Sequence, residues 1–351
     1  MNRSALPKAA LPKSALPKSA PTLGAMALAA LLMAGCGQAV SQSPATQKAG
    51  TAPASASAGS IENCGRTLTF DAAPDRVVAM TPGQSELLVK LGLAHKVVAE
   101  AQTKGRELQP ELKARGDVKQ LSDQMPPSRE VLLGANPDFV YSPTAYEFTA
   151  EQGFASIEQL KQAGAEAYIA TAGCQERRSK AEVTDILTDI DKIGAVFGAG
   201  AKTTAVRDEA ATALSAVNKA VAGKQKPTVV ELFVEGNSIA AIGAGLEYDM
   251  IKTAGGDNLF SPSDEAFATF FSALISPETL VQKNPEVIVF TTLDKAHEEA
   301  TRTFLKEKFP QVAAVKSDRL VAVNSDDVMP GTWGNIRAVE QIAKGLHPEA
   351  F

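Results

Sequence analysis

The chain has 351 residues, of which 44% are hydrophobic and 21% charged, and its formal net charge at pH 7 is −5. That length accommodates one large globular domain or two ordinary ones. The acidic balance argues against nucleic acid as a partner.

The first 35 residues are predicted to be a lipoprotein signal peptide. Their charges are all basic, and an apolar run over residues 23–33 follows them. A run of about 11 residues suits the core of a secretory signal and is shorter than the roughly 20 residues that span a bilayer. It ends in Ala34-Gly35-Cys36, which resembles the lipobox of bacterial lipoproteins, so Cys36 is expected to be acylated. A soluble secreted protein cleaved near Ala34 is the alternative.

Residues 36–60 are predicted to be the lipidated cysteine and a disordered tether. The segment consists almost wholly of Ala, Ser, Thr, Gln, Gly and Pro, which bury too little apolar surface to offset the entropy of ordering. Such a tether suits a folded body that works beside a membrane and is held there by acyl chains. We therefore expect an extracytoplasmic location, on the outer face of the plasma membrane or in the periplasm.

Two cysteines remain in the exported body, Cys64 and Cys174. Because an oxidising compartment favours disulfides, we expect the two to be paired. Two free buried thiols are the alternative.

The body is predicted to be α/β, with two similar lobes that each hold a mostly parallel central sheet. The predicted strands lie at residues 76–80, 96–101, 138–141, 167–170, 228–234, 286–291 and 319–323. Four of them precede residue 175 and three follow residue 225. The expected divisions are an N-terminal lobe over 61–178, a helical linker over 179–223 and a C-terminal lobe over 224–351.

The linker is predicted to be helical because it lacks proline and begins with apolar residues at 3-to-4 spacing. Glycines at positions 194, 198 and 200 indicate a break. Beyond them, residues 201–221 are rich in good helix formers, and a helix of that length would span about 30 Å. We expect this long helix to bridge the two lobes.

An internal repeat relates the two lobes. EVLLGANPDFVY at residues 130–141 matches ETLVQKNPEVIV at residues 278–289. Each copy reads as a short helix, an Asn-Pro terminator and a buried strand. Glu130 and Glu278 fall in the first helical turn after a serine, where a carboxylate interacts well with the helix dipole. Serving only as helix-start residues is one interpretation of the pair.

Several stretches together resemble the periplasmic binding proteins for iron–siderophores, haem and vitamin B12, whose two lobes are joined by a rigid helix. They are GRTLTF at 65–70, APDRVV at 73–78, ELLVKLG at 86–92, the two Asn-Pro repeats, AGGDN at 254–258 and LHPEAF at 346–351. The resemblance covers nearly all of residues 64–351. It implies a monomeric receptor that delivers its ligand to the permease dimer and ATPase of an ABC importer. It also implies that Glu130 and Glu278 dock to permease arginines.

The expected ligand is a ferric siderophore whose iron is held through the chelate, so no cofactor or protein metal site is expected. Cobalamin, haem or another bulky cofactor precursor is the alternative, followed by a free metal ion or a purely structural lipoprotein. An enzyme is not expected, because a nucleophile elbow, a Walker-type phosphate loop and a histidine cluster are all missing from the sequence; the histidines are scattered at His95, His297 and His347.

The ligand of a two-lobed receptor is expected to lie against loops at the strand ends. Candidates on the first lobe are Thr81, Pro82, Gly83, Gln84, Tyr141, Tyr146 and Phe148. Candidates on the second are Phe233, Glu235, Asn237, Tyr248, Phe267, Phe270, Phe271, Trp333 and Arg337. A core role for Phe267, Phe270 and Phe271 and a solvated helix position for Arg337 are the structural alternatives. An arginine would suit an anionic chelate, whereas aromatic walls suit a flat or apolar one.

Overall fold

The computed structural model describes residues 59–351. The predicted signal peptide, Cys36 and nearly all of the tether lie outside these residues. Within them, no helix is both long and apolar enough to cross a membrane.

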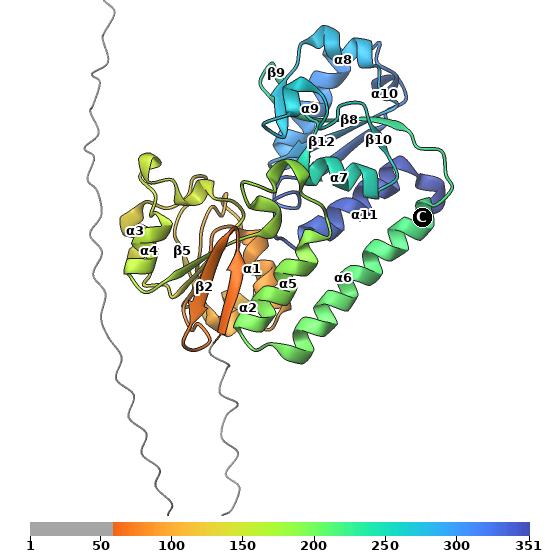
Figure 1. The fold of residues 1–351 in the computed structure, drawn as a ribbon. Coiled ribbons are helices and arrows are strands. Elements are labelled where there is room, and N and C mark those ends of the chain that lie inside the picture. Colours follow the sequence, from red (N-terminus) through yellow and green to blue (C-terminus); the bar gives the residue numbers. More distant parts are fainter. Residues whose placement is uncertain (1–58) are drawn as a thin grey trace, which may run out of the picture. The chain divides into compact units, whose positions relative to one another are not determined.

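The first lobe is built on a five-stranded, wholly parallel sheet with the order β5-β4-β3-β6-β7 (Figure 1). The strands are β3 (Val77–Ala79), β4 (Val97–Glu100), β5 (Lys119–Gln120), β6 (Phe139–Ser142) and β7 (Glu166–Ile169). An antiparallel hairpin, β1 (Gly59–Asn63) and β2 (Arg66–Phe70), packs beside the sheet. The helices are α1 (Pro82–Lys90), α2 (Pro110–Arg115), α3 (Arg129–Gly134) and α4 (Ile157–Gln162).

The second lobe has a six-stranded mixed sheet, with the order β11-β9-β8-β12-β13 and β10 paired to β8. The strands are β8 (Thr228–Glu235), β9 (Ser238–Ile242), β10 (Asp257–Asn258), β11 (Ser272–Leu274), β12 (Val287–Thr292) and β13 (Leu320–Asn324). The pairs β8–β9 and β9–β11 are antiparallel, and the other pairs are parallel. The helices are α7 (Gly245–Thr253), α8 (Pro277–Lys283), α9 (Lys295–Lys308), α10 (Ala313–Lys316) and α11 (Gly334–Leu346).

All seven predicted strands are present, because parallel strands covered on both faces read as continuous apolar runs. Strand β12, for example, is buried along its whole length. The prediction missed the β1–β2 hairpin and the short strands β5, β9, β10 and β11.

Two helices follow the first lobe, α5 (Asp185–Val196) and α6 (Gly200–Val221). The predicted long helix is present as α6, which lies alongside α5 and α11 in Figure 1. The helical stretch starts six residues later than residue 179, because Arg178–Lys180 forms a 3-10 turn and Ala181 is extended. Six further 3-10 turns lie at Ala94–Lys96, Tyr146–Phe148, Ala150–Gln152, Thr171–Gly173, Glu265–Phe267 and Pro348–Ala350.

One apolar core joins the two lobes. It contains Phe139 and Tyr168 of the first sheet, Val229 and Val289 of the second, and residues of α1, α5, α6, α7 and α11 between them. The outer face of each sheet packs separately, against α3 and α4 in the first lobe and against α8, α9 and α10 in the second. Bending one lobe against the other would therefore disturb a continuous core.

The internal repeat has the same local structure in both lobes. Ser128 and Ser276 cap α3 and α8, each accepting a backbone N–H three residues on. The asparagines Asn136 and Asn284 both have left-handed backbones, with φ of 51° and 43°, a conformation that asparagine tolerates. The acid after each proline then accepts a backbone N–H at the start of the neighbouring strand, Asp138 from Arg76 at 2.8 Å and Glu286 from Thr228 at 2.7 Å.

Candidate functional site

Both sheets direct their loops toward one region. In the first lobe the chain order reverses direction between β3 and β6, and in the second it does so between β8 and β12. Loops after neighbouring parallel strands leave a crevice at such a point, which is where open α/β sheets bind ligands. The loops after β6, β7 and β13 and the end of β12 all contribute to the cavities described next.

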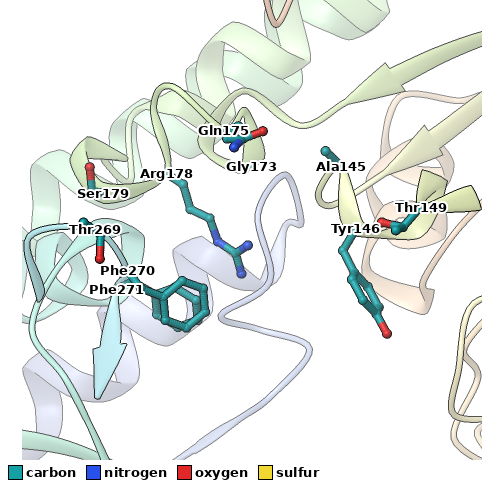
Figure 2. A pocket seen from close by; sticks show the side chains of 10 residues that line it. All are labelled: Ala145, Tyr146, Thr149, Gly173, Gln175, Arg178, Ser179, Thr269, Phe270 and Phe271. Carbon is teal, nitrogen blue, oxygen red and sulfur yellow. The ribbon is translucent and has the colours of Figure 1, made fainter. Parts of the chain in front are cut away.

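An outer cavity of about 440 Å³ lies between the lobes (Figure 2). Its walls are Ala145, Tyr146, Thr149, Gly173, Gln175, Arg178, Ser179, Thr269, Phe270 and Phe271. Tyr146 and Phe270 are 43% and 47% exposed, unusually high values for large aromatic side chains in a folded body. Two aromatic walls that face solvent suit a bulky, partly apolar ligand.

Arg178 lies between the phenylalanine pair and Tyr146 in Figure 2. Its guanidinium carbon is 4.7 Å from the ring centroid of Phe271 and 5.2 Å from that of Phe270, within the range of cation–π attraction. Burial lowers the pKa of Arg178, and the nearby carboxyl groups of Glu147 and Glu247 counter that shift. Arginine nevertheless stays charged in proteins, so the wall carries a fixed positive group.

A second cavity of about 190 Å³, here called the inner chamber, adjoins the outer cavity at Arg178. The two share Arg178 and Phe271, and the remaining walls of the chamber are Thr144, Ala172, Leu246, Glu247, Thr291, Ser325, Val328, Met329 and Pro330. Burial raises the pKa of Glu247 to about 7, and Arg178 partly opposes that shift. The chamber therefore contains a cation and a carboxyl group that is half protonated near neutral pH.

Two further carboxyl groups lie close to this chamber. Glu147 is buried, accepts hydrogen bonds from Ser142 and Thr144 at 3.2 and 2.6 Å, and has its pKa raised by burial. Glu231, in the middle of β8, is fully buried, and neither of its carboxyl oxygens has a hydrogen-bond partner within residues 59–351. Burial, and then repulsion from Glu247, raise the pKa of Glu231.

Tyr146 and Phe270 are the two predicted ligand-binding residues that line the outer cavity, together with Phe271 from the wider set of candidates. Phe148 is buried in the core behind the first sheet, and Phe267 is buried against Phe260. Both point inward because the turns that carry them fold back onto their own lobes.

Another group of predicted residues lies in a joint between the lobes. Gln84 donates a hydrogen bond to the Pro330 carbonyl at 2.8 Å and also contacts Thr81, while the hydroxyl of Tyr141 donates to the Gly331 carbonyl at 2.6 Å. An added Cβ on Gly83 would lie 2.4 Å from Thr332 Cγ2, so backbone and loop are in close contact here. Gln84 and Tyr141 thus form hydrogen bonds with the loop after β13, and these buried side chains line neither cavity.

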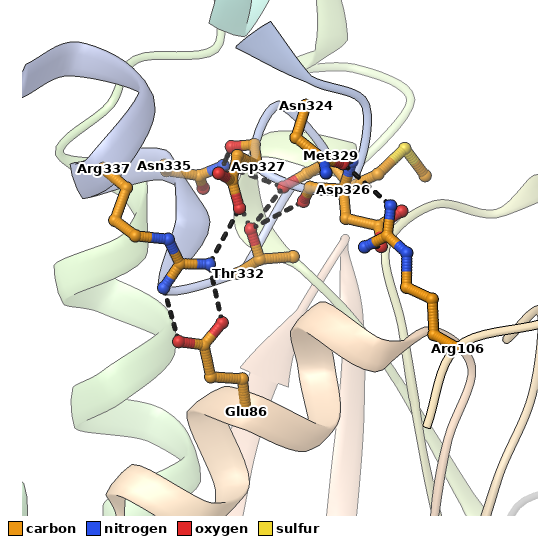
Figure 3. A network of polar contacts seen from close by, with 9 residues as sticks. All are labelled: Glu86, Arg106, Asn324, Asp326, Asp327, Met329, Thr332, Asn335 and Arg337. Carbon is orange, nitrogen blue, oxygen red and sulfur yellow. Dashed lines mark hydrogen bonds and ion pairs between the residues drawn. The ribbon is translucent and has the colours of Figure 1, made fainter. Parts of the chain in front are cut away.

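Arg337 and Trp333 belong to the same joint (Figure 3). Arg337 forms ion pairs with Glu86 on α1 and with Asp327, and Trp333 is buried beneath Lys90, whose ammonium is 4.0 Å from the ring centroid. On the other side of the joint, Arg106 and Lys104 pair with Asp326. The predicted cleft arginine is thus engaged in holding the lobes together.

The remaining candidates lie away from both cavities. Strand β8 continues into a tight hairpin with β9, which carries Glu235 and Asn237 to an exposed turn and places Phe233 against His297. Tyr248, on α7, is half-buried but lines neither cavity. The prediction treated the end of β8 as a cleft loop, which holds for a strand followed by a crossover and not for a hairpin.

The prediction missed Arg178, Glu247 and Thr291. Arg178 follows β7 by nine residues and Thr291 is near the end of β12, so the strand-end argument covers both positions. Glu247 gives a weaker signal, since its place in the first turn of α7 also suits an ordinary helix-start acid.

A disulfide joins Cys64 to Cys174, with the two Cα atoms 5.2 Å apart. It links the β1–β2 turn to the segment after β7, whose Gly173 and Gln175 line the outer cavity. Glu176 lies beside this bond and completes the one group of three potential metal-ligating residues within 59–351. Bonded sulfurs are not thiolate ligands, so this group does not form a metal site.

Comparison with known proteins agrees with this architecture. The sequence profile of the family described as "Periplasmic binding protein" matches residues 77–326. The chain is 26% identical over 326 residues to the uncharacterized ABC transporter substrate-binding lipoprotein YvrC of Bacillus subtilis, covering 90% of this chain and 93% of that one.

Among solved structures, the chain resembles an ABC-type Fe3+-hydroxamate transport protein from Saccharomonospora viridis, with a TM-score of 0.66 and 20% identity. The match covers 82% of this chain and 98% of that one. It also resembles the vitamin B12 binding protein BtuF of Vibrio cholerae, with a TM-score of 0.61, 18% identity and coverage of 79% and 98%. The chain therefore belongs to the periplasmic binding protein family.

Proposed function

We propose that this protein is the extracytoplasmic, lipid-anchored receptor of an ABC importer and delivers a bulky metal chelate to its permease. The observation that carries the proposal is the outer cavity, which takes walls from both lobes and exposes Tyr146 and Phe270 around a fixed arginine. Aromatic walls around a fixed cation suit the binding of a bulky ligand.

The size of the site favours a large ligand. Pockets for drug-sized molecules measure about 300–1,000 Å³, and the outer cavity and inner chamber contribute about 440 and 190 Å³. The outer cavity is also open to solvent, so part of a chelate can protrude. A free amino acid or metal ion would leave most of this volume unfilled.

A ferric siderophore is the proposed ligand, with its iron held through the chelate. The similarity to an Fe3+-hydroxamate transport protein is consistent with this choice, and the similarity to a B12 binding protein makes a corrinoid the second candidate. Transporter coupling is supported by the printed name of the Bacillus subtilis relative, a substrate-binding lipoprotein of an ABC transporter. Acylation of Cys36 and the division into lobes at residues 61–178 and 224–351 belong to the same proposal.

The test is to purify the protein from its own host and record native mass spectra together with an absorbance scan. We expect an added mass with the absorbance of a ferric chelate or corrinoid. Phe270→Ala should reduce the bound fraction, whereas Phe351→Ala, which removes an equally exposed ring at the C-terminus, should leave it unchanged. Co-purification of an amino acid, sugar or peptide would overturn the proposal.

A further inference from the structure

The segment between β13 and α11, residues 325–333, is here called the β13–α11 loop. It contains neither helix nor strand, yet most of its residues are buried, among them Asp326, Val328 and Thr332. Connecting segments normally run over the surface, because buried backbone groups need hydrogen-bond partners. The partners of its carbonyl groups therefore show what holds this loop in place.

Side chains at the end of the loop and the start of α11 fix its shape (Figure 3). The Thr332 hydroxyl lies 3.2 Å from the carbonyl oxygens of both Asp326 and Met329. Nδ2 of Asn335 donates to the carbonyls of Asp327 and Met329 at 2.9 and 2.8 Å. These contacts close the loop on itself, so the second lobe determines its conformation.

The first lobe fixes where the loop lies. The Pro330 carbonyl accepts a hydrogen bond from Gln84 at 2.8 Å, and the Gly331 carbonyl accepts one from the Tyr141 hydroxyl at 2.6 Å. Both donors are buried and come from the other lobe. Two neighbouring carbonyl groups are thus bound across the joint.

Gly83 allows this close approach. An added Cβ there would lie 2.4 Å from Thr332 Cγ2 and 2.8 Å from Thr332 Cβ, closer than real Cβ atoms come to other atoms. Gly83 lies in the first turn of α1 and does not have a positive φ. Its missing side chain therefore serves the contact with the loop and not an unusual backbone conformation.

The same loop is a major wall of the inner chamber. Ser325, Val328, Met329 and Pro330 line the chamber, more residues than any other segment contributes. Pro330 has both roles, because it lines the chamber while its carbonyl is bound by Gln84. A wall that belongs to the second lobe is thus placed by the first.

We propose that Gly83, Gln84 and Tyr141 are positioning residues for ligand binding, which set where the β13–α11 loop stands as a wall of the inner chamber. They line neither cavity, so they act through the loop. A binding site must be held to within about 0.5 Å by the residues that support it. This inference rests on the proposed function and adds residues on which affinity depends without contact.

The main test compares two glycine-to-alanine variants that create the same kind of clash. Gly83→Ala places a methyl group against Thr332, and Gly194→Ala places one 2.0 Å from Thr203 Oγ1, away from both cavities. Wild type is titrated calorimetrically with ferrichrome, ferric enterobactin, cyanocobalamin and hemin, and the probe that binds most tightly is used for the variants. Gly83→Ala should weaken its binding by at least about tenfold, and Gly194→Ala by less than about twofold.

Two further variants test the mechanism. Thr332→Ser removes the nearest clashing atom and keeps the hydroxyl, so it should recover part of the affinity when added to Gly83→Ala. Gln84→Met combined with Tyr141→Phe removes both hydrogen bonds across the joint and should weaken binding by about 3- to 10-fold.

Trp333 reports on the loop without ligand. It is the only tryptophan in the chain, it ends the loop, and it is 8% exposed. Gly83→Ala should make its fluorescence more accessible to acrylamide quenching, and Gly194→Ala should not.

The outcomes separate the positioning role from the receptor function. If Gly83→Ala exposes Trp333 but binds the probe as wild type does, the loop moves without affecting the site and the positioning role is wrong. An equal loss of affinity in Gly194→Ala would show that lower stability, and not the wall, weakens binding. If none of the four probes binds wild type, the proposed function fails and the positioning role with it.

Discussion

Glu231 is fully buried and Glu247 is half-buried beside it, and folding alone does not account for two carboxyl groups in this place. Glu231 lies between apolar residues in the buried middle of β8, and the carboxyl group of Glu247 is close enough to repel it. Removing a carboxylate from water costs several kcal/mol unless it is paired or protonated. Burial therefore raises the pKa of both acids in the folded protein.

This burial predicts how stability changes with pH. Glu247 has a folded-state pKa of about 7, above its ordinary value of 4.5, so the folded state binds this proton more tightly than the unfolded state. The corresponding stabilisation is fully present below about pH 4.5 and is lost as the pH rises through 7. Glu247→Gln should flatten the fall in unfolding free energy between pH 4.5 and 7, measured by urea denaturation.

Burial also raises the pKa of Asp189 to about 6, which lowers the unfolding free energy over the same pH range. Asp189 is present in both the wild type and Glu247→Gln, so the difference between their slopes does not contain its contribution. The exposed acid Glu299 provides the control, since Glu299→Gln should reproduce the wild-type slope. Equal slopes for Glu247→Gln and wild type would show that Glu247 is hydrated in the folded state.

For single residues, the sequence indicated some of the side chains that line the cavity but not which residues form hydrogen bonds or ion pairs with each other. Tyr146 could be found because it follows a predicted strand, and Phe270 because it belongs to a cluster of phenylalanines that was a candidate cleft wall. The roles of Gln84, Tyr141 and Arg337 could not, because their partners Pro330, Gly331 and Glu86 lie up to 251 positions away in the chain. Only the relative placement of two lobes brings such residues into contact.

Among the elements, the disulfide between Cys64 and Cys174 fixes the β1–β2 turn to one wall of the cleft. Their separation in sequence is 110 residues, for which the chain-entropy model gives a stabilisation of about 4–5 kcal/mol. Replacing both cysteines by serine should lower the unfolding free energy by up to this amount. It should also weaken ligand binding, because Gly173 and Gln175 beside the bond line the outer cavity.

Thiol titration of the unfolded, unreduced protein checks the bond itself. We expect neither Cys64 nor Cys174 to react, while both should react after reduction. Two reactive thiols before reduction would contradict the pairing.

The glycines of the linker are a second case at the level of elements. Gly194 looked from the sequence like part of a break, yet it lies inside α5 and is buried. An added Cβ there would lie 2.0 Å from Thr203 Oγ1, so Gly194 allows α5 and α6 to approach closely. The turn between the helices instead uses Gly198 and Gly200, both with positive φ.

Gly194→Ala should therefore destabilise the protein by about 1–3 kcal/mol, even though alanine is the better helix former. Urea denaturation measures the change, and Thr203→Gly in the same chain should recover part of it. Gly134→Ala is the control, since nothing lies within 4 Å of an added Cβ at the end of α3. A neutral Gly194→Ala would mean that the two helices separate without cost.

Elements were the level that the sequence predicted best. The long strands and α6 have strong periodic signals, and the Asn-Pro repeat correctly paired α3 with α8. The prediction missed the short strands β9 and β11 because five and three residues carry little pattern. Their antiparallel pairing also depends on the β8–β9 hairpin.

In the whole molecule, the lobes are connected by more than one helix. Arg337 with Glu86 and Asp327, Arg106 with Asp326, and the buried contact of Gly83 with Thr332 all cross between them beside the shared core. Many independent connections resist bending, so the distance between surface points on the two lobes is expected to stay nearly constant. A constant distance is what the proposed docking to a permease through both lobes would require.

Glu130 and Glu278 are suited to such a two-point contact. Both are exposed, and in each the backbone N–H groups of its helix start lower the carboxyl pKa, so both are charged at neutral pH. Glu130 is paired only with its neighbour Arg129, on the protein surface. With the lobes held in place, the first contact would bring the second carboxylate close to its site, so the two act together as a bivalent ligand.

Replacing both glutamates by alanine should therefore leave ligand affinity and folding nearly unchanged and weaken binding to the permease in lipid nanodiscs by at least about tenfold. Each single replacement should lose more than half of the free energy lost by the double variant, because it removes one contact together with the advantage of linking that contact to the other. Lysine at both positions should be worse, since it places like charges against permease arginines. Glu111→Ala with Glu307→Ala removes two exposed acids from other helices and should dock normally. If the double alanine variant instead loses ligand and docks normally, Glu130 and Glu278 act in the cleft and the permease contacts another surface.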